Sequence, residues 1–414
     1  LPAEKIFPYA AQPPEQFIPG KPLFYATAMP LGGVATGLLV ESHMGRPTKV
    51  EGNPSHPASL GSSDAFAQAS VLSLYDPDRS QAVYTRGRLS SWSAFLTDFE
   101  AVAAGMLASK GAGLRILTET VTSPTIASQL GALLARYPEA RWHQYEPVSR
   151  DGAREGGRMA FGEVVNTVYH FDRADVIVSL DSDFLSSGPG HVRYARDFAG
   201  RRRMPDEKST QNRLYVVEST PSPTGTMADH RLPLTSSQVE HFARALAAAL
   251  GAGGTAAGLA LPPSIPASWI PAISRDLRGH RGSSLVIAGD EQPPIAHAIA
   301  HAMNHALGNV GSTVTYTAPL EANPVHQMES LRGLVGDIQG GKVKTLVVLG
   351  GNPVYDAPAD LDFASNLLKV DLRVHLGSHY NETANLSHWH IPQTHFLEDW
   401  SDARAFDGRG NYNM

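Results

Sequence analysis

The sequence predicts an α/β protein with two doubly wound parallel-sheet lobes of related design and a small β-rich N-terminal domain. From about residue 92 onward, apolar runs typical of buried strands alternate with amphipathic helical segments. Such alternation favours parallel sheets with helices on both faces. The alternation occurs twice, and a length of 414 residues itself points to more than one domain. Two halves of this kind usually hold a ligand at the carboxyl ends of their strands.

The N-terminal part of the chain is expected to be a tether followed by the small domain. Residues 1–22 are rich in proline and have no hydrophobic period, which favours an extended tether lying on another surface. Residues 34–50 hold two apolar runs around the tetrapeptide SHMG, which predicts a small hairpin. We expect this hairpin to belong to a domain that spans residues 23–70.

The first α/β half begins with a buried strand at 113–120. A helix should follow it, with Ser123 as the N-cap and Pro124 at the first helical position. Two further strands and a glycine-terminated helix are expected at 174–184, 212–220 and 236–254.

The second half repeats this succession. Residues 283–309 are similar in pattern to 113–137, and the strands expected at 343–354 and 371–377 correspond to those at 174–184 and 212–220. The segments Thr224 to Pro233 and Thr383 to Pro392 place a threonine and a final proline at the same spacing. The recurrence indicates two related halves that face each other.

Composition excludes several classes of function. The formal net charge of −6 argues against nucleic acid as a partner, because a basic footprint would be expected. The sequence contains no cysteine, so it excludes disulfides, thiolate zinc sites, iron–sulfur ligation and a cysteine nucleophile. The longest uncharged stretch, 245–274, is rich in Ala, Gly and Pro, so we predict no membrane span.

One turn carries a family resemblance. GRPTKVEGNPSHP, residues 45–57, resembles the turn G-R-x-x-x-x-E-G-x-P-x-H-P of the molybdopterin oxidoreductase superfamily, through Gly45, Arg46, Glu51, Gly52, Pro54, His56 and Pro57. Longer strings such as RWHQYEPVSRD and LVVLGGNPVYDAPADLDF resemble one branch, the large molybdopterin-oxidoreductase-like (iron–sulfur) subunit of bacterial alternative complex III, a quinol-oxidising respiratory complex.

The resemblance implies interleaved domains. Residues 23–70 would be a degenerate iron–sulfur domain. The first lobe would be discontinuous, formed from 71–138 and 280–414, and the second lobe would be 139–279. We expect the later domains of the superfamily to be absent from this chain.

Departures from the family pattern bear on the chemistry. Asp64 stands where the superfamily has its last cluster cysteine, and Phe66 stands where a lysine would link cluster and pterin. At the first nucleotide-binding turn, DSDF, from Asp181 to Phe184, replaces G-x-N-P. Two carboxylates there would repel a phosphate. The second half keeps a phosphate-compatible turn, which we interpret as a vestigial cofactor site or simply a tight strand-to-helix turn: Gly350, Gly351, Asn352 and Pro353.

These departures predict that the chain holds no cofactor, has no catalytic residue or metal ligand and is not itself catalytic. The expected role is that of a structural subunit of a membrane-bound quinol:electron-acceptor (cytochrome) oxidoreductase, alternative complex III, in respiratory electron transfer. It would lie on the periplasmic side of the bacterial inner membrane, held there by its complex. Its partners would be heme-containing and integral-membrane subunits and a ferredoxin-like iron–sulfur domain.

Two alternatives remain open at this point. One is an active molybdopterin-dependent oxidoreductase whose metal has a non-cysteine ligand. The more remote one is a soluble protein that binds a small nucleotide in the vestigial cleft, in which case the nucleotide should stabilise the fold.

Other titratable residues have competing interpretations. His297, His301 and His305 have the i, i+4 spacing of a zinc or copper site, or are polar positions of an amphipathic helix. His388, His390 and His395, with His375 and His379 nearby, could relay protons or be hydrogen-bonded at a domain seam. Asp181 and Asp183 could be a general acid and base, or could cap the next segment or pair with the basic residues of 193–203.

Overall fold

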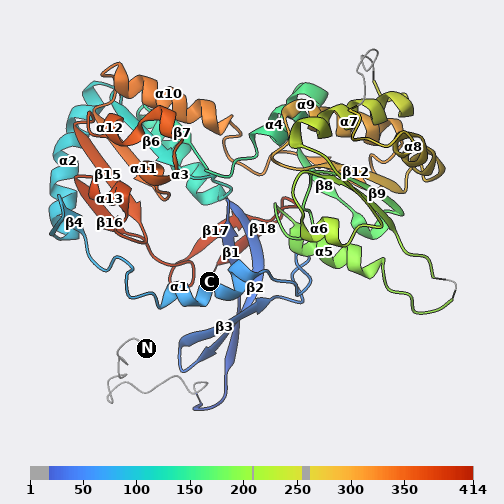
Figure 1. The fold of residues 1–414 in the computed structure, drawn as a ribbon. Helices are drawn as coiled ribbons and strands as arrows, with labels where there is room; N and C mark the ends of the chain where they lie inside the picture. The colour runs from blue at the N-terminus through green and yellow to red at the C-terminus, as the bar shows by residue number, and fades with distance from the viewer. Residues whose placement is uncertain (1–17, 208, 254–261, 414) are drawn as a thin grey trace.

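The computed structural model describes residues 18–207, 209–253 and 262–413. In these residues the chain forms two α/β lobes side by side, with a small β-rich domain beneath the space between them (Figure 1). Of the expected tether at 1–22, residues 1–17 lie outside the described part. None of the described helices is both long enough and apolar enough to cross a membrane.

The first lobe is built on a seven-stranded sheet with the order β5-β4-β16-β15-β14-β6-β7. Strands β16, β15, β14, β6 and β7 run parallel, whereas β4 and β5 are antiparallel additions at one edge. The strands are β4 (Tyr84–Thr85), β5 (Arg88–Leu89), β6 (Leu114–Thr118), β7 (Arg141–Gln144), β14 (Thr345–Leu349), β15 (Leu372–Gly377) and β16 (Trp389–Pro392). The helices are α2 (Trp92–Ala108), α3 (Pro124–Arg136), α10 (Gln327–Gln339), α11 (Pro353–Asp356), η2 (Ala359–Leu361), α12 (Phe363–Leu367) and α13 (Glu382–Asn385).

The second lobe has a four-stranded parallel sheet with the order β11-β10-β9-β12. Its strands are β9 (Val176–Leu180), β10 (Arg213–Glu218), β11 (His230–Pro233) and β12 (Ser284–Ala288), and β8 (Asn166–Tyr169) and β13 (Val314–Thr317) form a separate antiparallel pair. The helices are α4 (Asp151–Phe161), η1 (Phe171–Arg173), α5 (His191–Gly200), α6 (Pro223–Thr226), α7 (Ser236–Leu250), α8 (Trp269–Gly279) and α9 (Pro294–Ala306). Every residue of β9 is buried because helices cover both faces of the sheet.

The two sheets confirm the prediction of two doubly wound lobes of related design. Along the second sheet the order β12-β9-β10-β11 matches β6-β14-β15-β16 of the first. The similarity of 283–309 to 113–137 therefore has a structural basis, since β12 and β6 occupy the same position next to the central strand. The helix after β6 also begins as predicted, with the Ser123 hydroxyl accepting a hydrogen bond from the Ile126 N–H at 3.0 Å.

Strand pairing places the lobe boundaries differently from the expected 138/139 and 279/280. Strand β7 pairs with β6 and so belongs to the first lobe, whereas β12 pairs with β9 and belongs to the second. The connections between the lobes are therefore near 145–150 and 318–326. The expected boundaries came from the family resemblance, whereas long-range strand pairing decides lobe membership.

The small domain takes strands from both ends of the described chain. Its five-stranded sheet contains β1 (Leu23–Leu31), β2 (Val34–His43), β3 (Arg46–Gly52), β17 (Ser401–Arg404) and β18 (Gly410–Asn413), and α1 (Ala65–Leu74) packs against it. The hairpin predicted within 34–50 is present. Its two-residue turn, Met44 and Gly45, has φ of 52° and 78°, as hairpin turns of this kind require. The expected first lobe therefore loses residues 401–413 to the small domain.

Candidate cofactor site at the carboxyl ends of the strands

The turn from Gly350 to Pro353 follows β14 at the carboxyl edge of the first sheet. Gly350 has a φ of 78°, which favours glycine, and a Cβ added there would come within 2.5 Å of the Glu119 Oε2. The Asn352 Oδ1 accepts hydrogen bonds from the Thr383 N–H at 3.2 Å and from the Thr383 hydroxyl at 2.8 Å. Pro353 opens α11.

The DSDF turn after β9 has the corresponding geometry in the second lobe. The Asp183 Oδ1 accepts from the Thr224 N–H at 3.0 Å and from the Thr224 hydroxyl at 2.7 Å. Asp183 thus takes the place of Asn352, and Thr224 that of Thr383. Both threonines are fully buried. The repeated spacing seen in the sequence therefore preserves a bond between two loops.

Asp181 and Asp183 serve as structural acceptors. The Asp181 carboxylate accepts from the Ser219 N–H at 2.7 Å and from the Gln292 side-chain amide at 2.8 Å. Asp183 also accepts from the Ser186 hydroxyl, so it caps the segment that follows it. These bonds match the expected capping role, whereas Arg193, Arg201 and Arg202 form ion pairs with other acids: Asp197, Asp175 and Asp229.

Three carboxylates surround the Gly350 turn. Glu119 follows β6 and is exposed to solvent, although neighbouring protein atoms exclude part of its hydration. This desolvation, together with repulsion from Glu146 and Asp356, raises the pKa of Glu119 to about 7, and a hydrogen bond from the Gly351 N–H only partly offsets it. Burial, with repulsion from Glu146, also raises the pKa of Asp356 to about 6.

These residues do not fit an anionic nucleotide group at either turn. A phosphate site needs exposed backbone N–H groups and neutral or positive surroundings. Here the N–H groups of Gly351, Thr224 and Ser219 are bonded to the chain's own carboxylates. The glycine at 350 leaves room for Glu119, so its lack of a Cβ has a local explanation.

Two of the histidines that the sequence analysis singled out form a chain of hydrogen bonds next to the Gly350 turn. His375 and His390 stack, with their Nδ1 atoms 3.1 Å apart, and both side chains are buried. The His375 Nε2 lies 3.2 Å from the Gly351 carbonyl, which can only accept. His375 Nδ1 must therefore accept from His390 Nδ1–H, and His390 Nε2 accepts from the Ser80 hydroxyl at 2.7 Å. Burial lowers the pKa of His390 to about 4, so the chain is neutral near pH 7.

The other predicted histidines lie in separate places. The His388 Nδ1 accepts from the Arg373 N–H, and the His395 Nε2 lies 3.0 Å from the Ser73 hydroxyl of α1, at a seam between domains. His297 and His301 are buried against α4 and Tyr316, so the interpretation as polar positions is wrong for these two. His305 is exposed. Within the described residues, no group of three or more His, Cys, Asp or Glu side chains could hold a metal ion.

Two arginines of the second lobe donate hydrogen bonds to residues 57 and 60, at the end of the turn that carries the family resemblance and just beyond it. From α5, Arg193 donates to the Pro57 carbonyl at 2.6 Å and Arg196 donates to the Leu60 carbonyl. The Asp64 carboxylate caps α1 by accepting from the Ala67 N–H at 2.7 Å. It also lies 3.1 Å from the His191 Nε2 of α5. The position of the expected cluster ligand is therefore occupied by a contact between domains.

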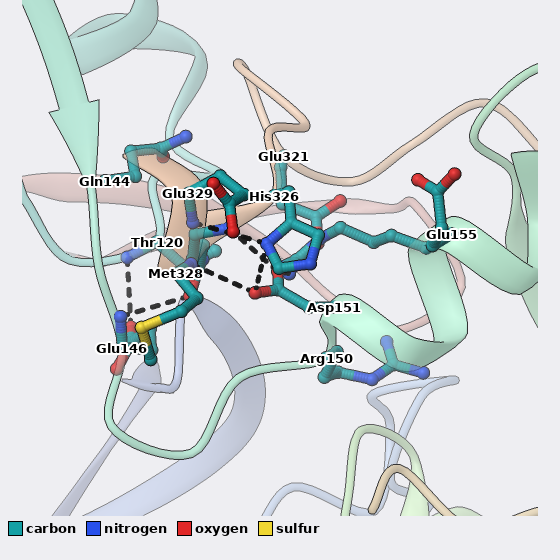
Figure 2. Close-up of polar contacts among 12 residues, drawn as sticks. Thr120, Gln144, Glu146, Arg150, Asp151, Glu155, Glu321, His326, Met328 and Glu329 are labelled. Carbon is teal, nitrogen blue, oxygen red and sulfur yellow. Dashed lines mark hydrogen bonds and ion pairs between the residues drawn. The ribbon is translucent and has the colours of Figure 1, made fainter. Parts of the chain in front are cut away.

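A polar cluster joins the lobes at the two connections between them. Asp151, at the start of α4, accepts from the N–H groups of Gln327 and Met328 at 2.8 and 3.0 Å, and so caps α10 of the other lobe (Figure 2). Arg154 bonds both Asp151 and Glu321, at 3.1 and 2.8 Å. All three side chains are at least 85% buried.

Sequence reasoning missed Glu119, Glu146 and Asp151. Glu119 had one available signal, since it directly follows a predicted strand in the string LTET. Asp151 lies at the start of a helix that bears acidic residues, which is common and therefore uninformative.

The chain was compared with protein-family models, with curated proteins and with solved structures. No protein-family model matches the chain. The menaquinone reductase molybdopterin-binding-like subunit of Nitratidesulfovibrio vulgaris is 25% identical over 431 aligned positions, covering 93% of this chain and 60% of that protein. The acetylene hydratase of Pelobacter acetylenicus, a molybdopterin oxidoreductase-family enzyme, superposes with a TM-score of 0.69 at 13% identity, covering 94% of this chain and 66% of that one. The chain is thus similar in sequence to the first of these proteins and similar in fold to the second.

The similarity covers only part of the length of these two proteins. This molybdopterin oxidoreductase-like chain spans 60% of the length of its curated relative and 66% of the acetylene hydratase chain. A formyltransferase/hydrolase complex from Methylorubrum extorquens also matches, with a TM-score of 0.51 at 14% identity, over 80% of this chain and 93% of that one. The structural matches are below 25% identity and describe the fold.

Proposed function

We propose that this chain is a cofactor-free structural subunit of a membrane-bound quinol:electron-acceptor oxidoreductase of the alternative complex III type. It would take part in respiratory electron transfer on the periplasmic side of the inner membrane. The relative is named as a molybdopterin-binding-like subunit of a menaquinone reductase, which supports membership of a quinone-converting complex.

One observation carries the proposal. At the Gly350 turn and the DSDF turn, the chain's own carboxylates accept hydrogen bonds from the backbone N–H groups of Gly351, Thr224 and Ser219, so these donors are not free for an anionic cofactor. The Asp64 contact with His191 supports it independently, because that position serves domain docking. In this role the lobes would hold electron-carrying partners, a ferredoxin-like iron–sulfur domain and heme-containing and membrane subunits, in fixed positions.

The test is metal and pterin analysis of the chain purified within its native complex. We expect molybdenum, tungsten and pterin well below one equivalent per chain, while a molybdopterin enzyme analysed in parallel gives full occupancy. Stoichiometric molybdenum or tungsten would overturn the proposal and favour an active oxidoreductase with an oxygen ligand. Neutralising the turns with Glu119→Gln and Asp183→Asn should leave the metal content unchanged.

A further inference from the structure

The first lobe contains a cavity on its outer side, away from the Gly350 turn. The cavity has a volume of about 660 Å³ and lies between α2 and the amino-terminal ends of β6, β7 and β14. Helix α2 forms the outer edge of this lobe (Figure 1). The volume is within the range of small-molecule sites, about 300–1,000 Å³. Nothing in the proposed function uses this cavity.

One wall of the cavity is apolar. It consists of the side chains of Val102, Met106 and Ala112 together with the backbone of Gly105 and Gly113. A Cβ added at Gly105 would meet no atom within 4 Å, so this helical glycine faces open space. Elsewhere on α2 the side chains of Trp92, Leu96 and Leu107 are also exposed. The side of the cavity formed by α2 therefore offers hydrocarbon surface to a ligand.

The rim of the cavity is basic. The side chains of Arg141, Lys342 and Lys344 are more than 60% exposed. The Asp337 carboxylate is shared among cations: it lies 2.8 Å from Arg115 Nη2, 3.1 Å from Arg141 Nη1 and 3.8 Å from Lys342 Nζ.

The remaining charges leave the rim with a positive excess. Lys344 pairs with Asp371 at 3.2 Å, but both side chains are about two-thirds exposed, and such pairs contribute little. Glu139 is a further carboxylate on the lining. The basic groups number four, because Arg115 adds to Arg141, Lys342 and Lys344. The acidic groups number three: Asp337, Asp371 and Glu139.

We propose that this cavity binds an amphiphile that has an anionic head group and a hydrocarbon chain. The head group would lie among Arg141, Lys342 and Lys344, and the chain would cover Val102, Met106 and the open space at Gly105. Burying hydrocarbon on the apolar wall supplies affinity, at about 25 cal/mol per Å² of surface removed from water. The basic rim selects the sign of the head group, because an unpaired ammonium there would be repelled.

The test uses dodecanoate as the free amphiphile and dodecylammonium as its charge-reversed counterpart, with binding to the full chain measured by calorimetry below the micellar concentration. Dodecanoate should bind and dodecylammonium should not. Gly105→Leu fills the cavity without changing charge and should weaken binding at least about tenfold, close to 1.4 kcal/mol. Gly131→Leu is the matched control, because Gly131 is an exposed helical glycine in α3 with open space around it.

A second set of variants, which removes positive charge from the rim, tests the role of the basic residues. The double variant Lys342→Gln and Lys344→Gln should weaken dodecanoate binding, whereas Lys49→Gln and Lys369→Gln, with the same change in net charge elsewhere, should not. Cosedimentation with phosphatidylcholine vesicles, with and without phosphatidylglycerol, separates two sources of the ligand. Binding only to the anionic vesicles, abolished by Gly105→Leu, assigns the site to a lipid of a membrane leaflet. No binding in either format, or binding that Gly105→Leu leaves unchanged, overturns the proposal.

Discussion

The His191 Nε2 of the second lobe lies 3.1 Å from the Asp64 Oδ2 of the small domain, and both side chains are more than 80% buried. The hydrogen bond and charge of His191 hold the pKa of Asp64 below its usual range. Asp64 in turn raises the pKa of His191, against the effect of burial. The pair therefore joins two domains by an interaction that depends on pH.

Replacing Asp64 by Asn should destabilise the fold mainly at mildly acidic pH. The His191 contribution is present below its unfolded pKa, near 6.5, and is lost as pH rises through the raised folded value. The Asp64 contribution is present above the unfolded carboxyl pKa and is lost as pH falls. Asn caps a helix as well as Asp does. The decrease in the free energy of unfolding, about 1 kcal/mol, therefore measures the contribution of the Asp64 charge.

Thermal denaturation of Asp64→Asn and wild type at pH 6 and pH 9 measures this effect. Asp76→Asn is the matched control, since Asp76 pairs with His379 at 3.2 Å on the surface. We expect a larger difference at pH 6 than at pH 9 for Asp64→Asn, and little change for the control. An equal loss at both pH values would contradict the assignment.

Glu119→Gln should stabilise the protein above pH 7. A folded pKa of about 7, above the ordinary value of 4.5, means that ionising Glu119 costs stability as pH rises between these values. Solvent access screens part of this cost, so we expect a gain of about 1 kcal/mol at pH 8 and none at pH 4. Urea denaturation at the two pH values measures it, and a loss of stability at pH 8 would argue against the acidic cluster.

Gly350→Ala should be destabilising because of both its φ of 78° and the approach of Glu119. The backbone contribution is about 1 kcal/mol or more. Combining Gly350→Ala with Glu119→Ala should recover the part due to the side-chain clash, as a double-mutant cycle would show. A strictly additive cycle would mean that the two residues do not touch.

The neutral histidine chain should weaken in acid. The folded pKa of His390, about 4, is below the unfolded value near 6.5, so the unfolded state binds more protons and stability is lost as pH falls from 6.5 towards 4. His390→Gln should flatten this part of the melting-temperature profile. Ser80→Ala removes the donor to His390 but keeps the ring, so it should lower stability while preserving the slope. An unchanged slope in His390→Gln would contradict the burial argument.

Asp151→Ala should loosen the connection between the lobes. It would leave the N–H groups of Gln327 and Met328 without their acceptor and the buried Arg154 with Glu321 as its remaining ion-pair partner, which typically costs about 2–4 kcal/mol. Faster proteolysis near 145–150 and 318–326 would report the effect. Glu155→Ala on the same helix is the control, because Glu155 pairs with the exposed Arg158 one turn along α4. Equal protease resistance of both variants would exclude Asp151 as the link.

The repeated architecture could be predicted from sequence because strand–helix alternation and the spacing of Thr224 and Thr383 are local patterns. The lobe boundaries could not, because β7 and β12 are assigned by pairing with strands far away in the chain. The cluster of Glu119, Glu146 and Asp356 is likewise assembled by topology. A carboxylate beside a glycine turn leaves no periodic signal in a single sequence. His297 and His301 show that i, i+4 spacing identifies a shared helix face but not whether that face is buried.

The sheet of the small domain has a consequence for synthesis. Strands β1 to β3 leave the ribosome early, but their sheet is completed by β17 and β18, which follow both lobes in the chain. The link between the two parts, at Arg404 and Val34, therefore forms only after more than three hundred further residues have been translated. The small domain is therefore the last of the three parts to be completed during synthesis.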